Sequence, residues 1–176
     1  IGRLGWLEDL DPEEAVRKQV EVNLLGAIWT ARAVLPHMIE RREGHIVNMG
    51  SGASFIATPT YSVYAATKFG MRGFTEALRR EAGVYGIRVS GIYPGGVDTE
   101  FVEQTGMNRK TGFTTPRIIR LEAEEVAAAV LHLVRRNRRS TVMPGVLNLA
   151  VGINRLVPGL VDWIIERWFV RPERGA

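Results

Sequence analysis

The chain has 176 residues, a formal net charge of +4 and no cysteine. This length suffices for one domain with a hydrophobic core, and 45% hydrophobic and 24% charged residues are typical of an ordinary soluble globular protein. The absence of cysteine excludes disulfides and thiolate metal sites and fits a cytoplasmic location. The charge is too small and too scattered to indicate nucleic-acid binding. The three histidines have no metal-ligand spacing, so no metal site is predicted.

The first half of the chain has the pattern of helices alternating with strands. After a loop over residues 1–10, Asp11 is a good N-cap and Pro12 a good first helical residue. We expect the helix that follows to kink or break at Pro36 and to stop at Gly44. The next predicted elements are a buried strand over 45–50, a small-residue loop over 51–54, a helix over 61–85 and a strand over 87–93.

The second half continues this pattern. Residues 100–120 show no clear period, which is typical of a functional lid or a disordered segment. A helix over 122–136 and a short strand over 140–143 are predicted after it. The alternation predicts an α/β fold with a doubly wound parallel sheet and right-handed crossovers. Ligands of such sheets bind outside the carboxyl ends of the strands.

Three signals converge on that edge of the sheet. Ser51 follows the first strand, and the turn Pro94-Gly95-Gly96 follows the second. Tyr64 and Lys68 are four residues apart, so they share one face of the helix between these strands. An ammonium one turn away favours the phenolate and can lower the pKa of a tyrosine toward the working range of an acid–base catalyst. The alternatives are a solvated tyrosine–lysine pair and a simple turn serine.

Four stretches in order resemble the short-chain dehydrogenase/reductase family over roughly residues 1–144. The strand run Gly44-His45-Ile46-Val47-Asn48-Met49-Gly50-Ser51 resembles the strand that ends in the catalytic serine, and Tyr64-x-x-x-Lys68 resembles the hallmark pair. The other two are Val22-Asn23-Leu24-Leu25-Gly26 and Pro94-Gly95-Gly96-Val97-Asp98-Thr99. The resemblance implies a Rossmann-like fold and an NAD(P)-dependent oxidoreductase that interconverts an alcohol and a ketone or aldehyde.

The resemblance also implies roles for single residues. Tyr64 would be the general acid–base, and Ser51 would hydrogen-bond the same substrate oxygen. Lys68 would lower the pKa of Tyr64 and hold the nicotinamide ribose, while Asn23 would orient a water in a proton relay. The residues implied to contact the cofactor are Tyr64, Lys68, Pro94, Gly95, Gly96, Val97 and Thr99.

The sequence also departs from the family pattern. It has no G-x-x-x-G-x-G phosphate turn and no residue that would choose between NAD and NADP, with NADP slightly favoured. We therefore expect the C-terminal half of a longer enzyme, a homodimer or homotetramer when full length, that binds cofactor poorly on its own. Two alternatives stay open: a non-catalytic fragment or dimerisation module, and an epimerase or dehydratase of the extended branch.

Residues 145–176 are predicted to form an amphipathic, helical C-terminal extension near the substrate site. Two apolar segments lie on either side of Pro158, and charged residues interrupt them, so a spanning helix is not predicted. The extension either closes over the substrate pocket or forms a peripheral membrane surface through residues 145–170, with Trp163 and Trp168 at headgroup level. Both interpretations suggest an apolar or lipid-like substrate. The basic run over 135–139 is interpreted as a helix C-terminus.

Overall fold

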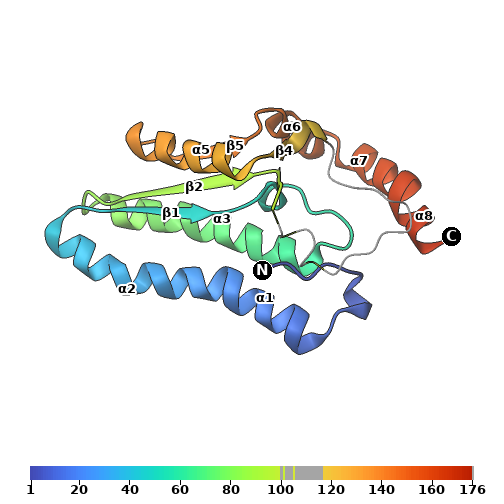
Figure 1. The fold of residues 1–176 in the computed structure, drawn as a ribbon, viewed down its shortest axis with the longest axis horizontal. Coiled ribbons are helices and arrows are strands. Elements are labelled where there is room, and N and C mark those ends of the chain that lie inside the picture. The colour runs from blue at the N-terminus through green and yellow to red at the C-terminus, as the bar shows by residue number, and fades with distance from the viewer. Residues whose placement is uncertain (100, 102–104, 106–116, 176) are drawn as a thin grey trace.

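The computed structural model describes residues 1–99, 101, 105 and 117–175. Most of the predicted lid over 100–120 lies outside these residues. Figure 1 shows the order of the elements along the chain. Their bounds are η1 Leu7–Asp9, η2 Pro12–Arg17, α1 Lys18–Val20, η3 Glu21–Leu25, α2 Gly26–Arg41, β1 His45–Met49, η4 Gly52–Ser54, α3 Ser62–Gly83, β2 Arg88–Pro94, β3 Gly96–Val97, η5 Arg117–Ile119, β4 Arg120–Leu121, α5 Ala123–Arg135, β5 Ser140–Met143, α6 Val146–Leu156, α7 Pro158–Ile165, η6 Glu166–Val170 and α8 Arg171–Arg174.

The helical stretch from residue 12 to residue 41 begins as predicted and continues differently. The Asp11 carboxylate accepts hydrogen bonds from the backbone of Glu13 and Glu14 at 2.9 and 2.7 Å. The stretch departs from α geometry in η2 and η3, which are π-helical, and not at Pro36, which lies inside the continuous helix α2. Of the two expectations for Pro36, a kink or a break, the break is therefore wrong. The helix also ends before Gly44, because Arg42 adopts a left-handed conformation (φ 52°) and its N–H bonds back to the last turn.

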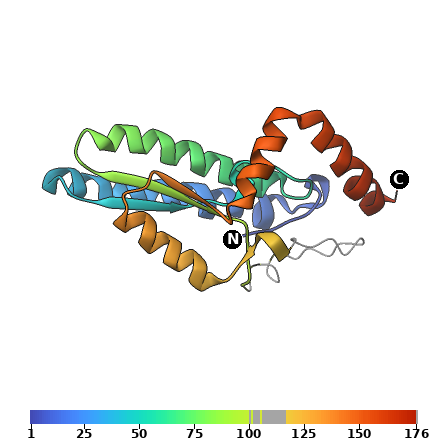
Figure 2. The same ribbon diagram turned by 90° about the horizontal axis from the view of Figure 1, so that it is seen from above.

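The central sheet is parallel, with the strand order β1-β2-β5. In register, His45 lies opposite Arg88 and Met49 opposite Ile92. Figures 1 and 2 show α2 and α3 on one face of this sheet and α5 on the other. This three-layer arrangement confirms the predicted α/β fold, and each crossover between neighbouring strands contains one long helix.

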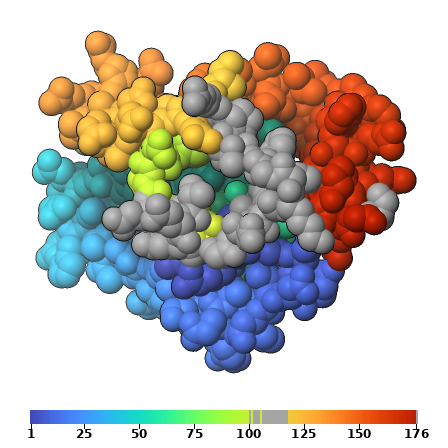
Figure 3. All heavy atoms as spheres, turned by 45° about the vertical axis from the view of Figure 1, so that its right-hand side comes forward, coloured from blue at the N-terminus to red at the C-terminus, as the bar shows by residue number. Residues whose placement is uncertain are grey.

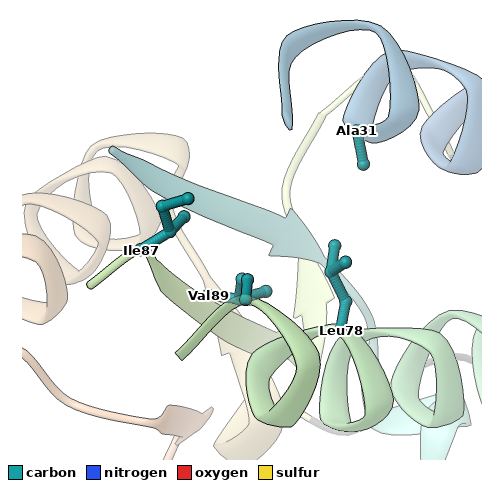
Figure 4. Packing of buried hydrophobic residues seen from close by; sticks show 5 residues of the cluster. Ala31, Leu78, Ile87 and Val89 are labelled. Carbon is teal, nitrogen blue, oxygen red and sulfur yellow. The ribbon is translucent and has the colours of Figure 1, made fainter. Parts of the chain in front are cut away.

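Each face of the sheet has its own hydrophobic core. On the α2–α3 side, Ala31, Leu78, Ile87 and Val89 pack together, as Figure 4 shows. On the α5 side, Ile92 and Leu133 are fully buried together with Leu121 and Val126. Val89 and Ile92 are three positions apart on β2, so the alternation of a strand directs them to opposite faces. The two cores fix β2 between helices and so fix the position of its carboxyl end.

The C-terminal extension is helical, as predicted, and it returns toward the beginning of the chain. Helices α6 and α7 separate at Pro158, and α8 follows η6 (Figure 2). The Arg174 guanidinium stacks 3.9 Å from the Trp6 ring centre and bonds the Glu8 carboxylate at 2.5 Å. Within the described residues, no helix combines the length and the apolar character needed to cross a membrane.

Candidate active site

Ser51 lies directly beyond the carboxyl end of β1, where the sequence predicts it. Its backbone is extended, and it caps the short helix η4. The Ser51 hydroxyl accepts a hydrogen bond from the Ala53 N–H at 3.2 Å, and the Ser51 N–H donates to the hydroxyl of buried Ser54 at 3.2 Å. This reciprocal pair fixes the Ser51 side chain at the edge of the sheet.

Helix α3 brings Tyr64 and Lys68 to the same edge. Tyr64 is buried, with 9% of its surface exposed, and its phenol lies near enough to the Ser51 hydroxyl for that group to affect its pKa. The Lys68 ammonium lies 5.6 Å from the centre of the Tyr64 ring and donates to the carbonyl of Met49, the last residue of β1, at 3.2 Å. The structure thus brings together three of the four residues predicted to be catalytic, from a strand end and a helix face.

The pKa of Tyr64 does not shift downward, as the neighbouring Lys68 ammonium alone would predict. Burial raises the pKa of Tyr64, and the Ser51 hydroxyl lowers it by a smaller amount. Burial also lowers the pKa of Lys68, although this residue is only partly buried. The net shift of the Tyr64 pKa is therefore upward, opposite to the direction expected from Lys68 alone. At neutral pH the phenol is protonated, the form that can donate a proton.

Asn23 is buried in the π-helical segment η3, and two successive hydrogen bonds link its side chain to the backbone of Tyr64. Its side-chain amide donates to the Thr67 hydroxyl at 3.5 Å, and that hydroxyl donates to the Tyr64 carbonyl at 2.7 Å. The amide also pairs with the backbone of Ile1, accepting from its nitrogen at 2.7 Å and donating to its carbonyl at 2.8 Å. Asn23 therefore connects the first residues of the chain to the helix that carries Tyr64.

The turn after β2 lies beside the turn that carries Ser51. A Cβ added to Gly52 would lie 3.6 Å from the Pro94 carbonyl oxygen and 3.9 Å from the Gly95 Cα. At Gly95 an added Cβ would lie 2.5 Å from the Ile119 carbonyl oxygen, so this position has no room for a side chain. The parallel pair β3–β4 and a bond from the Asp98 N–H to the Leu121 carbonyl (2.8 Å) hold the chain beyond the turn.

Thr99 is exposed beyond this turn. Its hydroxyl makes two long local bonds, to the Val97 carbonyl at 3.5 Å and from the Phe101 N–H at 3.4 Å. Both bonds are weak, so the hydroxyl is available to another partner. Of the predicted cofactor-contact residues in this stretch, Pro94 and Gly95 thus lie beside the turn that carries Ser51.

Sequence reasoning missed two residues around the cluster. The Phe101 ring lies 5.7 Å from the Tyr64 ring, and an isolated phenylalanine in an aperiodic segment gives no signal of this. Gln19 is completely buried, and its side chain exchanges two hydrogen bonds with the Arg3 backbone at 2.9 and 3.0 Å. Its spacing of four residues from Asn23 was a usable signal, since both polar side chains fall on one helix face.

A cavity of about 280 Å³ lies between α3 and β5, away from the cluster. Arginines 72, 79 and 139 and the carboxylate of Glu76 line it, together with Tyr93. None of the predicted site residues borders it. This cavity is therefore separate from the cluster around Tyr64.

The chain belongs to the short-chain dehydrogenase family. The family model for short chain dehydrogenases matches residues 1–110, which is more than half of the chain. The resemblance found in the motifs is thereby confirmed, as is the Rossmann-like fold.

Individual relatives extend this comparison. The chain is 32% identical over 151 residues to estradiol 17-beta-dehydrogenase 11 from Rattus norvegicus, covering 84% of this chain and 47% of that protein. It is 36% identical to a 3-oxoacyl-[acyl-carrier protein] reductase with bound NAD from Brucella melitensis (TM-score 0.61, 75% of this chain and 49% of that chain). A short-chain dehydrogenase from Sphingobium yanoikuyae in complex with NADPH has the same fold at 23% identity (TM-score 0.75, 92% of this chain and 61% of that chain). The chain spans about half the length of the curated relatives it matches.

Proposed function

We propose that this chain carries the catalytic residues of an NAD(P)-dependent oxidoreductase that interconverts an alcohol and a ketone or aldehyde. The observation that carries the proposal is the proximity of Ser51 and Lys68 to the buried phenol of Tyr64, with the Lys68 ammonium 5.6 Å from the ring centre. A phenol, a hydroxyl and an ammonium around one point suit proton transfer to and from a substrate oxygen. In this proposal residues 1–144 form the catalytic region, and residues 145–176 pack beside it.

Tyr64 exchanges the proton with the substrate oxygen in this mechanism. In carbonyl reduction the neutral phenol donates its proton, and its raised pKa keeps it protonated at neutral pH. In alcohol oxidation it must accept a proton, so any cation that approaches the phenol assists this direction. Ser51 holds the same oxygen, and Asn23 orders the segment around Ile1 through its paired hydrogen bonds.

The residues present fit a nicotinamide cofactor at its nicotinamide–ribose end. Within the described residues, the Lys68 ammonium makes one hydrogen bond, to Met49, which leaves donors for ribose hydroxyls. In the proposal the turn Pro94 to Val97, whose first two residues lie beside the Ser51 turn, and the exposed Thr99 hydroxyl contact the nicotinamide end. A bound cofactor would supply or accept the hydride. The Brucella reductase structure holds NAD and the Sphingobium structure holds NADPH, which supports this class of cofactor and leaves both members of it open.

The proposed partners are a small alcohol or carbonyl compound and, in the full-length protein, a second copy of the chain. Phe101 beside Tyr64 gives the substrate position an apolar wall. An apolar substrate therefore fits the position better than a highly charged one.

The proposal is tested by assaying the full-length protein with a panel of alcohols and carbonyl compounds and both cofactors, following the reduced nicotinamide by absorbance. Ser51→Ala should lower kcat/KM by about 100-fold, the size typical of a lost oxyanion contact. Ser62→Ala is the matched control, because Ser62 is exposed at the start of the same helix α3. The proposal would be contradicted if no substrate were turned over with either cofactor. It would also be contradicted if Ser51→Ala and Ser62→Ala had equal rates.

A further inference from the structure

The C-terminal extension carries an unusual concentration of exposed apolar side chains. Of the 21 large hydrophobic residues that are exposed in the described part of the chain, nine fall between residues 146 and 168. We call these nine residues the C-terminal apolar face: Val146, Leu149, Ile153, Leu156, Val157, Leu160, Trp163, Ile164 and Trp168. A contiguous apolar patch of this kind marks a binding surface in a soluble domain.

The spacing of these residues places them on one side of each helix. Leu149, Ile153 and Leu156 follow an i, i+4, i+7 pattern on α6, and the buried Leu147 lies on the opposite side. On α7, Leu160 and Ile164 are one turn apart, and Leu156 is 82% and Trp168 72% exposed on either side of them. Figure 2 shows α6, α7 and α8 as an arc beyond the end of the sheet, and Figure 3 shows this segment as one flank of the molecule.

The two basic and two acidic residues between 146 and 168 are distributed unevenly around the helices, and the charge on the apolar side is positive. Arg167 is exposed next to Trp168 and three residues from Ile164, on the side that carries the apolar face, whereas the exposed Arg155 is two residues from Ile153 and lies on the other side of α6. Two acidic groups of the extension do not present a free charge beside the face. Glu166 forms an ion pair with Arg171 at 2.7 Å, and Glu173 is buried. Asp162 is two residues from both Leu160 and Ile164, which places it on the other side of α7. The face therefore combines apolar groups with a positive charge, as an anionic lipid surface requires.

We propose that the C-terminal apolar face docks on an anionic lipid surface, with α6 and α7 lying in the plane of that surface. Two tryptophans, with Arg167 beside Trp168, have the amphipathic character of groups at the headgroup level. A second copy of the chain would bring the same positive charges together, in a protein with a net charge of +4, so the charges favour lipid over self-association.

The docked face lies on the outer side of a helix whose inner side touches the candidate active site. The Leu147 side chain lies 3.4 Å from the Cβ position of Gly52 and 3.2 Å from that of Gly95. Docking would thus place the site close to a source of apolar substrates. This consequence rests on the proposed function, whereas the docking itself does not.

The test is co-sedimentation of the full-length protein with vesicles of phosphatidylcholine alone or with phosphatidylglycerol added. We expect binding to the anionic vesicles that weakens with salt. Trp163→Ser combined with Trp168→Ser should reduce the partition coefficient at least about tenfold, because two large apolar side chains no longer enter the interface. Trp29→Ser is the matched control, since Trp29 is 61% exposed on α2, outside the proposed surface, and should leave binding unchanged.

Circular dichroism and the thermal midpoint of the double variant establish that it remains folded. Arg167→Gln, which keeps the apolar face, should weaken binding to anionic vesicles only. Absence of vesicle binding by the wild-type protein, or equal binding by the folded double variant, would overturn the proposal. Concentration-dependent self-association that the double variant loses, without vesicle binding, would overturn it in favour of a second copy. Turnover of a water-soluble alcohol is measured in parallel, so a failure of docking is distinguishable from a failure of the proposed function.

Discussion

Gln19 and Arg3 are joined by two reciprocal hydrogen bonds, in which the buried side-chain amide pairs with the backbone N–H and C=O of Arg3. One helical turn later, Asn23 pairs in the same way with the backbone of Ile1. The spacing of four residues on a helix nearly equals the spacing of two residues in an extended segment, so the two amides match alternate residues. They fasten residues 1–3 along the helical stretch α1–η3, which Asn23 also joins to α3 through the Thr67 hydroxyl.

Replacing Gln19 with leucine should therefore destabilise the protein. The change removes the partner of two partly buried backbone groups of Arg3, which we expect to cost about 1–3 kcal/mol of the free energy of unfolding. Urea denaturation of the full-length protein measures this cost. Lys18→Met, at an exposed neighbouring position, should change the free energy by less than about 0.5 kcal/mol. An equal, small effect of both substitutions would show that the paired hydrogen bonds contribute little.

Gly95→Ala tests the close approach of the two turns at the edge of the sheet. The new Cβ would lie 2.5 Å from the Ile119 carbonyl oxygen, so the turn or the chain around η5 must shift. We expect a loss of more than about 1 kcal/mol of stability, together with reduced turnover. Gly73→Ala is the control, because an added Cβ there meets no atom within 4 Å inside helix α3. That substitution should stabilise the protein by up to about 1 kcal/mol, and a similar loss for both variants would contradict the steric account.

His45 should make the stability depend on pH. Its Nε2 lies 2.8 Å from the Ser90 hydroxyl, which itself donates to the Arg138 carbonyl at 2.7 Å, so Nε2 carries the hydrogen. The Nδ1 atom is buried without a partner among the described residues, and protonation there would create an unpaired donor. Burial, with a smaller effect of the nearby Arg88 charge, lowers the pKa of His45. Because the folded-state pKa is lowered, the stability is complete above the ordinary pKa of about 6.5 and falls as the pH decreases below it.

The measurement is the urea midpoint between about pH 7.5 and about pH 5.5, a range that spans the ordinary histidine pKa. His45→Gln should reduce the slope of stability against pH, while His37→Gln, at an exposed position on α2, should not. Identical slopes for the wild-type and His45→Gln proteins would rule out His45 as the source.

The sequence predicted those parts of the fold that depend on local pattern. The strands at 45–49, 88–94 and 140–143 and the helix at 62–83 follow from apolar runs and turn residues, and they agree with the structure within two residues. The same patterns place Ser51 and the pair Tyr64–Lys68 at one edge, because the carboxyl ends of parallel strands meet there.

The parts that were missed depend on tertiary contacts. Pro36 stays inside α2, although a proline removes one helical hydrogen bond, and no local rule shows that the rest of the helix tolerates this. The short pair β3–β4 joins residues more than 20 positions apart with two residues each, too few for a pattern. The upward shift of the Tyr64 pKa arises from burial, which depends on the surrounding fold.

The most direct test of the proposed catalytic role is the turnover of Tyr64→Phe compared with Tyr61→Phe in the full-length protein. The two ring centres lie 6.0 Å apart and each variant loses one phenolic hydroxyl, but only the Tyr64 phenol is assigned the proton transfer beside Ser51. We predict that Tyr64→Phe lowers kcat by at least about 1000-fold, with an unchanged circular dichroism spectrum, and that Tyr61→Phe stays within about threefold of the wild-type rate. Turnover by folded Tyr64→Phe at the wild-type rate would contradict the assignment of Tyr64 as the general acid–base.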